Sequence, residues 1–489
     1  MKTVRTLALV VALAVTACFG QSWTSLNHQP SFGAGAMLLM TDGTVLVHSE
    51  QLNSQNWYKL TPDASGSYIN GAWSQIATMP AGYSPLYFGS AVLPDGRMTV
   101  IGGEYNNLQP VWTNLGAIYD PVANTWTSIA PPRGWNYIGD AQSVVLADGT
   151  LMQATCCYRT DGAALLNAKS LNWKKTGDNK FDVYDEEGWT LLPSGKVLTV
   201  DAYVGKYDPN GTGSEIYDPA TGAWSNAGST IVQLWDSCGG ANGATYEVGP
   251  MVLRPDGTVF ATGANACAAG HTSIYDTKTG TWTAGPDFPS IDGAADGPAA
   301  LETNGKVLVM VSNKAFKHGA AFYEWDGSAL TKTVSPLGGA SDSSFYGHFL
   351  ELPTGQILFS DFSSDIEVFT PAGTYNPAWQ PTISVAPTSV AAGQSYTVSG
   401  TQFNGLSQGA AYGDDYQSAT NYPLVRIVNN ATGHVFYCRT HDHSTMGVAT
   451  GSAKVSTVFD VPANIEKGAS QLYVVANGIP SAAVAVAVQ

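Results

Sequence analysis

Charge is scarce in this sequence, and most of it has one sign. Charged residues make up 12% of the 489 residues, and 22 Lys and Arg stand against 38 Asp and Glu, so the formal net charge is −16. Such a surface repels nucleic acid and anionic membranes, which excludes both as partners. Neutral or cationic partners remain, and we expect a monomer.

Long apolar runs are also missing, apart from one at the N-terminus. The stretch Leu7–Ala17 follows the basic Lys2 and Arg5 and is too short to span a bilayer as a permanent anchor. It predicts an export signal over residues 1–20. The protein is therefore expected to be secreted, periplasmic or extracellular, and nothing later in the chain is apolar enough to cross a membrane.

The cleavage site has two interpretations. Val15–Cys18 resembles a lipoprotein box, which would leave Cys18 acylated, whereas the alternative is cleavage near Gly20. The second is favoured because Trp23 begins the folded part without a flexible tether.

Cysteine is the third scarce residue. Removal of residues 1–20 leaves Cys156, Cys157, Cys238, Cys267 and Cys438. Export permits disulfides, so Cys238 could pair with Cys267 and the adjacent Cys156 and Cys157 could pair with each other. An odd count leaves at least one thiol over, and the absence of any CxxC spacing disfavours a zinc–thiolate site.

Glycine, tyrosine and tryptophan are abundant instead, at 53, 23 and 13 residues, as is typical of an all-β, turn-rich exported protein. One unit recurs: an apolar run, a tight turn ending in Gly, and a second apolar run. The seven turn glycines are Gly43, Gly96, Gly149, Gly195, Gly257, Gly305 and Gly355. Their intervals of 53, 53, 46, 62, 48 and 50 residues match the period of about 50 of kelch repeats, each a four-stranded propeller blade.

A second pattern agrees with the first. Three segments beginning "IYD" carry a Tyr and a Trp seven residues apart, at Tyr119 and Trp126, Tyr217 and Trp224, and Tyr275 and Trp282. These pairs fit the outer hairpin of a blade, with the aromatic rings packed between blades. We therefore predict a seven-bladed kelch β-propeller over residues 21–380.

The repeat stops near Trp379. Short alternating strands with turn residues between them then fill residues 381–489, which is room for one immunoglobulin-like β-sandwich. The chain exceeds the size at which a single core stops growing, which agrees with two domains.

The C-terminal part resembles a known family. The stretch "YGDDYQSATNYPLVRI" (Tyr412–Ile427) is similar to a signature of galactose oxidase-like proteins, and "RTHDHSTMGVATG" (Arg439–Gly451) follows it. In that family an early set domain sends a hairpin along the propeller axis and delivers a metal-binding His. The resemblance places His443 in that role.

The same resemblance implies a copper-radical centre that this chain cannot build. The family's copper oxidases use a Cys cross-linked to a Tyr, and a Tyr-His pair on the last blade. Alignment through the turn glycines puts Tyr87 at the Cys, Asp140 at the Tyr, and Phe345-Tyr346 at the pair. A galactose oxidase-like copper oxidase with an altered site, using His348 and His443, stays open as an alternative.

Acids occupy equivalent positions in four consecutive repeats. Asp140, Glu186 and Asp296 precede their turn glycines by nine residues, Glu187 by eight and Glu247 by ten. Because equivalent ends of the inner strands converge on a propeller axis, these carboxylates should form a ring at the mouth. A one-residue slip turns a side chain away, and we choose Glu187 over Glu186 and expect Asp185 to face solvent.

Two chemistries fit such a ring. Paired carboxylates suit a glycoside hydrolase, or a polysaccharide lyase with Tyr346, Tyr87 or His348 as the proton partner. Alternatively, Asp140, Glu187, Glu247, Asp296 and His443 would bind calcium, manganese or iron, with copper less favoured. The preferred hypothesis is an exported carbohydrate-active enzyme acting on a glycan, and the alternative is a non-catalytic propeller that binds a glycan or a protein.

Aromatic residues occur near the same loops. Trp135, Tyr137 and Trp189 could stack on sugar rings, although Trp189, inside an apolar run, is expected in the core.

Overall fold

The structure is a computed structural model that describes residues 20–50, 54–157, 162–203, 211–238 and 243–489. Among these residues the regular elements are β-strands and three short 3₁₀ turns, with no α-helix, so the all-β prediction is confirmed. No helix in the described ranges is long and apolar enough to cross a membrane. The predicted export signal and Cys18 lie outside the described residues.

Seven antiparallel sheets follow one another along the chain, and we number them 1 to 7; six of them have four strands and sheet 6 has six. Sheets 1 to 3 comprise β2 (Ala34–Leu39), β3 (Val45–Ser49), β4 (Trp57–Thr61), β5 (Ala72–Gln75); β7 (Gly89–Val92), β8 (Met98–Ile101), β11 (Gly116–Asp120), β12 (Thr125–Ser128); and β13 (Ser143–Val145), β14 (Leu151–Ala154), β15 (Ala163–Asn167), β16 (Asn172–Thr176). A small extra sheet of β6 (Pro85–Leu86), β9 (Tyr105–Asn106) and β10 (Gln109–Pro110) lies beside sheet 2 in the chain.

Sheets 4 to 6 comprise β17 (Thr190–Leu191), β18 (Val197–Val200), β19 (Ser214–Asp218), β20 (Ala223–Asn226); β21 (Met251–Leu253), β22 (Thr258–Thr262), β23 (Thr272–Asp276), β24 (Thr281–Ala284); and β26 (Ala299–Leu301), β27 (Val307–Asn313), β28 (Ala321–Trp325), β29 (Leu330–Lys332). A short strand, β25 (Asp292–Gly293), also pairs with β27. Sheet 7 comprises β30 (His348–Glu351), β31 (Ile357–Ser360), β32 (Glu367–Thr370) and, from the other end of the chain, β1 (Ser22–Ser25).

The first strands of successive sheets pack against one another. β2 contacts β7 and β7 contacts β13, and a second series of contacts runs from β17 through β21, β26 and β30 back to β2. These inner strands are buried along their length. Their N-terminal ends therefore lie close together, as the spacing of the acids required.

The seven turn glycines join the first and second strands of the seven sheets, and all have φ between +76° and +89°. A residue with a Cβ adopts this conformation only at a cost, so glycine at this point determines where each hairpin turns. The predicted hairpins are therefore confirmed.

The Tyr-Trp pairs face each other across the outer strands. Tyr275 is directly opposite Trp282, with ring centroids 5.0 Å apart. The indole N–H of Trp282 donates to Ser214 Oγ of the preceding sheet at 2.9 Å. The pair thus packs within one sheet and forms a hydrogen bond to the preceding sheet, which agrees with the predicted packing between blades.

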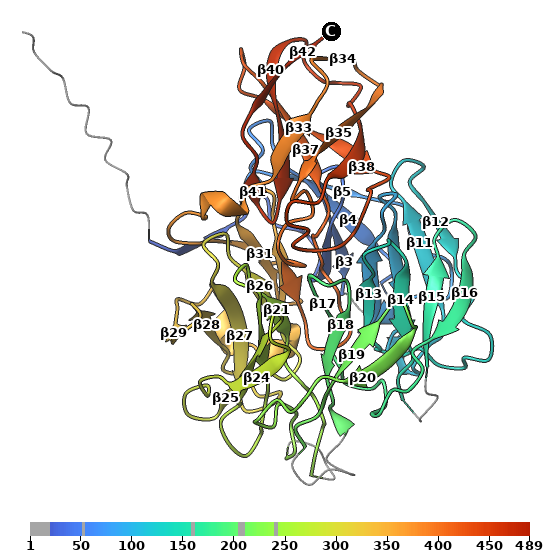
Figure 1. Ribbon diagram of the computed structural model, residues 1–489, viewed down its shortest axis with the longest axis vertical. Coiled ribbons are helices and arrows are strands. Elements are labelled where there is room, and N and C mark those ends of the chain that lie inside the picture. The colour runs from blue at the N-terminus through green and yellow to red at the C-terminus, as the bar shows by residue number, and fades with distance from the viewer. Residues whose placement is uncertain (1–19, 51–53, 158–161, 204–210, 239–242) are drawn as a thin grey trace, which may run out of the picture.

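The chain after the repeats forms a separate sheet, coloured orange to red at the top of Figure 1. Its strands are β33 (Thr382–Val385), β34 (Ser389–Val390), β35 (Ser395–Thr401), β37 (Leu424–Asn429), β38 (Val435–His441), β39 (Val455–Asp460), β40 (Gly468–Ala476), β41 (Ile479–Pro480) and β42 (Val484–Val488). It lies against the turn ends of the inner hairpins. A Cβ on Gly43 would overlap the ring of Tyr437, so the two parts pack closely there.

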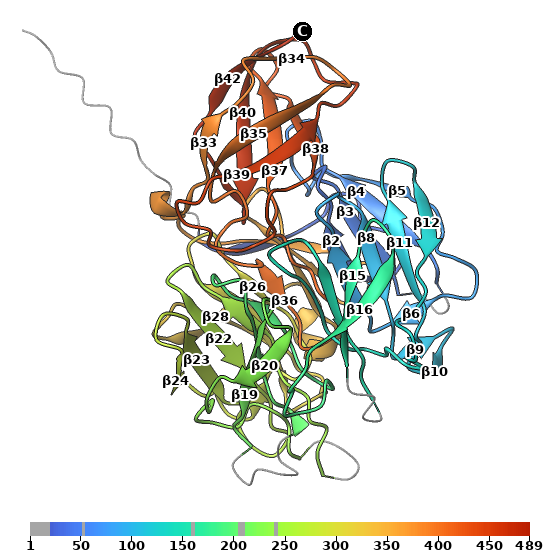
Figure 2. The same ribbon diagram turned by 45° about the vertical axis from the view of Figure 1, so that its right-hand side comes forward.

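One segment leaves this sheet and descends between the seven sheets. Residues 405–423 carry β36 (Ala410–Ala411), which pairs with the edge of β26 and lies in the middle of the sheets in Figure 2. We call residues 405–423 the axial segment. It brings residues of the C-terminal part to the N-terminal ends of the inner strands, at the face opposite the C-terminal sheet.

Candidate functional site

Four carboxyl groups meet beside the axial segment. Glu186 precedes β17, Glu247 precedes β21, Asp296 precedes β26, and Asp414 follows β36. One oxygen of each lies within 4.8 Å of the others, which is compatible with a single bound metal ion. We call these residues the axial carboxylates.

The backbone in front of the inner strands is strained at this site. Glu186 and Asp296 have φ of +57° and +38°, and Tyr87 at the equivalent position of sheet 2 has φ of +51°. Non-glycine residues in this region cost on the order of 1–3 kcal/mol each and cluster at functional sites. The strain turns Glu186 and Asp296 toward the axial segment.

Two glycines allow the axial segment to approach the acids. A Cβ on Gly413 would lie 2.6 Å from Asp296 Oδ1, and a Cβ on Gly188 would overlap the carbonyl oxygen of Gly413. The hydroxyl of Tyr412 donates to the carbonyl of Phe345 at 2.8 Å and anchors the segment on sheet 7. The position of Asp414 thus depends on glycine at 188 and 413.

Burial and neighbouring acids, rather than positive charges, determine the pKa values of the axial carboxylates. Burial raises the pKa values of Glu186, Glu247 and Asp414 well above their ordinary range, and neighbouring acids raise them further. Burial also raises the pKa of Asp296 to about 6. Among the described residues, Glu247 Oε2 and Asp296 Oδ1 are buried without a hydrogen-bond donor. The group must hold shared protons or a cation.

Further acids extend the group toward sheet 2. Burial, followed by Asp296, raises the pKa of Glu104 to about 7. Asp415 is buried beside Asp414, and burial and Asp296 raise its pKa. Glu104 and Asp415 do not stand just before the inner strands, so the distance from the turn glycines does not point to them. The acids of "YGDD" are the signal in the sequence for Asp414 and Asp415.

Glu247 and Asp296 lie among the axial carboxylates, but Glu187 does not. Glu187 is fully buried and pairs with Lys180 at 2.7 Å, while Glu186 faces the axial carboxylates. The choice of Glu187 over Glu186 was therefore wrong. The positive φ at Glu186 shifts the alternation of side chains by one residue. The side chain of Glu187 then forms an ion pair with Lys180.

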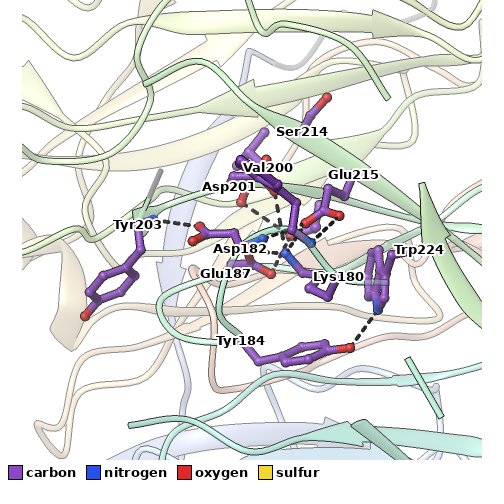
Figure 3. Close-up of polar contacts among 12 residues, drawn as sticks. Lys180, Asp182, Tyr184, Glu187, Val200, Asp201, Tyr203, Ser214, Glu215 and Trp224 are labelled. Atoms are coloured by element: carbon purple, nitrogen blue, oxygen red, sulfur yellow. Dashed lines mark hydrogen bonds and ion pairs between the residues drawn. The ribbon is translucent and has the colours of Figure 1, made fainter. Parts of the chain in front are cut away.

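Figure 3 shows the network that holds Glu187. Lys180 Nζ lies 2.6 Å from Glu215 and 3.5 Å from Asp201, in addition to Glu187. Asp182 accepts from the backbone N–H of Tyr203 at 2.7 Å and so connects this network to the loop after β18. We call Lys180, Asp182, Glu187, Asp201 and Glu215 the lysine network.

Asp140 lies beside the axial carboxylates in a second group. Its Oδ1 is 3.6 Å from Cys157 Sγ, and Asp185 Oδ1 is 3.7 Å from the same sulfur. Cys156 and Cys157 form a disulfide, as do Cys238 and Cys267, and Cys438 is a buried thiol, which agrees with the predicted pairs. The prediction that Asp185 faces solvent was wrong, because the Tyr203 hydroxyl donates to its carboxylate and Asp140 lies close by.

His348 and Tyr346 lie behind the acids rather than among them. The His348 ring packs 4.7 Å from Tyr416 and 5.6 Å from Tyr412, measured between ring centroids. Burial lowers the pKa of His348 to about 3, so the ring is neutral. Tyr346 is part of a 3₁₀ turn, and its carbonyl lies 3.2 Å from His348 Nδ1.

His443 is not brought to the acids. Its Nδ1 lies 2.9 Å from Thr457 Oγ1 of β39, and its ring is parallel to that of Tyr422 at 6.3 Å. The predicted delivery of His443 was wrong because the descending segment is 405–423, so the residues it delivers are Tyr412, Asp414 and Asp415. His443 stays beside the C-terminal sheet.

Three stacked rings border the axial carboxylates. Tyr203 stacks on Tyr246 with centroids 4.2 Å apart, and Tyr246 stacks on Trp235 at 5.4 Å. The pKa of Tyr203 is raised by burial and then by Glu186, which places its hydroxyl next to the acids. This ladder was not predicted. Trp189 is buried in the core as expected, and Trp135 is half-buried.

The residues present do not fit the copper-radical cofactor of galactose oxidase-like oxidases. The positions of the cross-linked pair hold Tyr87 and Asp140, the last sheet offers Phe345 and Tyr346, and His443 is absent from the mouth. Hard carboxylate oxygens in their place suit calcium, manganese or iron(II) better than a copper radical centre.

Comparison with known proteins agrees with the fold. No family model matches the chain. A kelch-like protein, terF, from Aspergillus terreus (strain NIH 2624 / FGSC A1156) is 28% identical over 130 residues, 26% of this chain and 26% of its own, so the match spans about a quarter of that curated relative.

Solved structures resemble nearly the whole chain. A fungal alcohol oxidase of the AA5 family, in complex with copper, matches 96% of this chain and 98% of its own with a TM-score of 0.50 and 14% identity. The extracellular domain of the one-component system BT4673 from B. thetaiotaomicron matches 86% of this chain and 52% of its own, with a TM-score of 0.48 and 10% identity. At 14% identity the likeness to the alcohol oxidase shows the fold alone.

Proposed function

We propose, for a chain with the kelch-type, galactose oxidase-like propeller fold, an exported carbohydrate-active enzyme that works with a divalent cation. The cation would be held by the axial carboxylates Glu186, Glu247, Asp296 and Asp414. In this proposal the seven sheets are seven blades, the C-terminal sheet is an immunoglobulin-like early set domain, and the protein is a monomer that binds a glycan at the mouth.

The observation that carries the proposal is the convergence of four carboxylates on one point, with Asp414 buried and Glu186, Glu247 and Asp296 partly buried. Burial raises the pKa of each, and the charges of other acids raise the pKa values of Glu186, Glu247 and Asp414 further. Removing charged acids from water without a neighbouring cation lowers the stability of the folded protein. A cluster of such acids therefore indicates a functional site. An oxygen-liganded cation removes the repulsion without protonation.

The aromatic ladder favours a sugar-like substrate. Tyr203, at the end of the stack next to Glu186, and Tyr246 in the middle are half-buried, whereas Trp235 at the other end is buried. An aromatic ring beside a few convergent polar groups suits a ligand with apolar ring faces and many hydroxyls. The strongly negative mouth disfavours acidic glycans and favours neutral ones.

Glu104 is the candidate general acid–base. Its pKa of about 7 matches the pH at which a proton-transfer group works best, and burial and Asp296 are the causes. A bound cation would act as a Lewis acid and lower the pKa of a coordinated hydroxyl or water. Glu104 would then accept or return the proton, while the axial carboxylates hold the cation.

The first test measures metal content and then activity. The purified wild type should retain about one divalent cation after dialysis, and anomalous diffraction should place it among the axial carboxylates. Asp414→Asn should lose most of the metal, whereas Asp287→Asn, at an acid whose side chain is 55% exposed, should keep it. Glu104→Gln should keep the metal and lose turnover on a neutral glycan by about 10²–10⁴-fold.

A metal-free wild type, or metal retained in full by Asp414→Asn, would refute the cation proposal. If metal binds but no neutral glycan is turned over, the enzymatic part fails and the cation site stands as part of a glycan-binding or protein-binding propeller.

A metal-free glycoside hydrolase is the second candidate. Asp296 has a pKa of about 6 while that of Glu247 is raised well above its usual range, and such a split can assign one acid and one base. The carboxyl oxygens lie within 4.8 Å, which is closer than the separation of about 6.5–9.5 Å in inverting enzymes. This candidate therefore predicts retention of configuration and activity in the presence of a chelator.

A further inference from the structure

A second cluster lies next to the axial carboxylates and is not explained by them. The vicinal disulfide Cys156–Cys157 and the carboxylates of Asp140 and Asp185 place one donor atom each within 4.8 Å of one another. Cys156 follows β14 of sheet 3, Asp140 precedes β13 of the same sheet, and Asp185 precedes β17 of sheet 4. The cluster therefore joins two neighbouring sheets at the mouth.

The disulfide contributes little as a cross-link. Disulfides stabilise a fold mainly by closing a loop in the unfolded chain, and the benefit grows with loop length. Cys156 and Cys157 are adjacent, whereas Cys238 and Cys267 are 29 residues apart. Adjacent residues are already held together by the chain, so the vicinal bond calls for a chemical explanation.

The local structure is shaped around the two sulfurs. A Cβ on Gly139 would overlap Cys156 Sγ and would lie 3.3 Å from Cys157 Sγ. The N–H of Cys156 donates to the carbonyl of Ile138 at 3.1 Å, which holds the cysteine pair against the loop that carries Asp140. Any larger residue at 139 would separate the sulfurs from the acid.

The disulfide form of Cys156 and Cys157 cannot donate a hydrogen bond to Asp140 or Asp185. A disulfide sulfur has no proton to donate, so the contacts of 3.6 and 3.7 Å between Cys157 Sγ and the two carboxylates are not hydrogen bonds. Two thiolates in the same place would complete a set of two sulfur and two oxygen donors. Zinc and cadmium accept such a set in a tetrahedron, with Zn–S of about 2.3 Å and Zn–O of about 2.0–2.2 Å.

We infer that Cys156, Cys157, Asp140 and Asp185 form a redox-gated site for a thiophilic divalent cation of the zinc or cadmium class. The disulfide is the closed state. An external dithiol opens it: its thiolate attacks the half-buried Cys157, and its second thiol resolves the mixed disulfide. Two electrons and two protons pass to the cysteine pair, the dithiol becomes a disulfide, and the metal displaces the two thiol protons.

This site is distinct from that of the axial carboxylates. A thiolate pair selects soft metals, while four carboxylates select hard ones. The two clusters share no residue, although Asp140 acts electrostatically on Glu186 and Asp414. Reduction of one bond would therefore add a second metal beside the first.

Cadmium is a suitable probe because its thiolate complexes absorb in the ultraviolet through charge transfer and its carboxylate complexes do not. The full chain is reduced anaerobically with a phosphine, which takes oxygen from water to form the phosphine oxide, and is titrated with Cd²⁺ in excess Ca²⁺. The reduced wild type should bind one Cd²⁺ with the charge-transfer band, and the oxidised wild type should show no band.

Three variants separate this site from other thiols and acids. Cys238→Ser/Cys267→Ser, which lacks the second disulfide that the phosphine reduces, should retain the band, and Cys156→Ser/Cys157→Ser added to that variant should lose it. Asp140→Asn/Asp185→Asn keeps both thiols and should bind Cd²⁺ at least tenfold more weakly. Near-ultraviolet circular dichroism checks that each variant, and the reduced wild type, is folded.

A folded, reduced wild type without the band would overturn the inference. So would a band that survives Cys156→Ser/Cys157→Ser added to Cys238→Ser/Cys267→Ser, or a Cd²⁺ affinity that Asp140→Asn/Asp185→Asn leaves unchanged. None of these outcomes bears on metal binding by the axial carboxylates, which has no charge-transfer signal.

Discussion

Replacement of Lys180 by Met should destabilise the protein more than any other single change of charge in or next to sheet 4. The ammonium group is the cation of the lysine network, and its side chain is 4% exposed. It lies 2.7 Å from Glu187, 2.6 Å from Glu215 and 3.5 Å from Asp201. Methionine fills a similar volume, so the change removes charge and little packing.

The magnitude follows from the desolvation of the partners. Glu187 and Glu215 are buried to 0% and 3% side-chain exposure, so removal of Lys180 leaves their charges without compensation and out of water. Breaking a buried ion pair from one side typically costs about 3–5 kcal/mol. Lys180 also lies 5.3 Å from the centre of the Trp224 ring, and loss of this cation–π contact adds about 1 kcal/mol.

The loss should depend on pH in a defined direction. Without Lys180 the pKa values of Glu187 and Asp201 rise further in the folded state, so these groups bind protons more strongly when folded than when unfolded. The variant is then stabilised where they are protonated and loses stability as pH rises through their folded pKa values. Already in the wild type the pKa of Asp201 is about 8, and burial is the main cause.

The assay is urea unfolding at pH 5 and pH 8, followed by tryptophan fluorescence. Lys180→Met should lose about 3–5 kcal/mol at pH 8 and clearly less at pH 5. Lys196→Met is the matched control, since Lys196 is 40% exposed and its pair with Asp218 is worth at most about 1 kcal/mol. Lys180→Met/Glu187→Gln should recover part of the loss.

The reasoning is refuted if Lys180→Met and Lys196→Met unfold at the same urea concentration at pH 8. It is also refuted if the loss in Lys180→Met grows as pH falls. Either result would mean that the acids around Lys180 are neutral or hydrated in the wild type.

Three further predictions concern the mouth. The metal-free protein should lose stability as pH rises from about 4 to 8, because the folded state raises the pKa of Glu104 to about 7 and that of Asp296 to about 6. Each group contributes on the order of 2–3 kcal/mol to this loss. Thermal unfolding scans with and without Mn²⁺ should show that the cation removes it. Gly413→Ala should lower the free energy of unfolding by about 1–3 kcal/mol and weaken metal binding, because the new Cβ would lie 2.6 Å from Asp296 Oδ1. In the control Gly116→Ala the atom nearest to the new Cβ would be 3.4 Å away, so neither effect is expected. Denaturation and metal titrations of both variants measure the two effects. Tyr246→Ala should raise KM for a neutral glycan without a change in metal content, and an unchanged KM would remove the aromatic ladder from the substrate site.

Much of the architecture could be predicted because its determinants are local. Each hairpin turn depends on one glycine with positive φ and on apolar residues on either side of it, so a pattern of about 14 residues is enough. The repetition of that pattern then placed Glu247 and Asp296 at equivalent strand ends, and the structure has both in the site.

The choice between adjacent residues could not be made in the same way. Glu186 keeps the nine-residue distance of Asp140 and Asp296 from the turn glycine, and consistent use of that distance would have selected it. Strand alternation favours Glu187 instead, and it fails where the backbone has positive φ. The partner that captures Glu187, Lys180, lies before the strand in a loop with no repeat pattern.

The sequence by itself determined the hairpins, the number and spacing of the repeats, and the wealth of acids before the inner strands, since all of these rest on short-range conformational preferences. Only the tertiary structure decided that Asp414 joins Glu186, Glu247 and Asp296, and that His443 stays behind. Asp414 is more than a hundred residues from its nearest partner in the chain, and its position depends on which segment descends between the sheets. That choice is made by close packing at Gly188 and Gly413 and by the pairing of β36 with β26, which are contacts between distant parts of the chain.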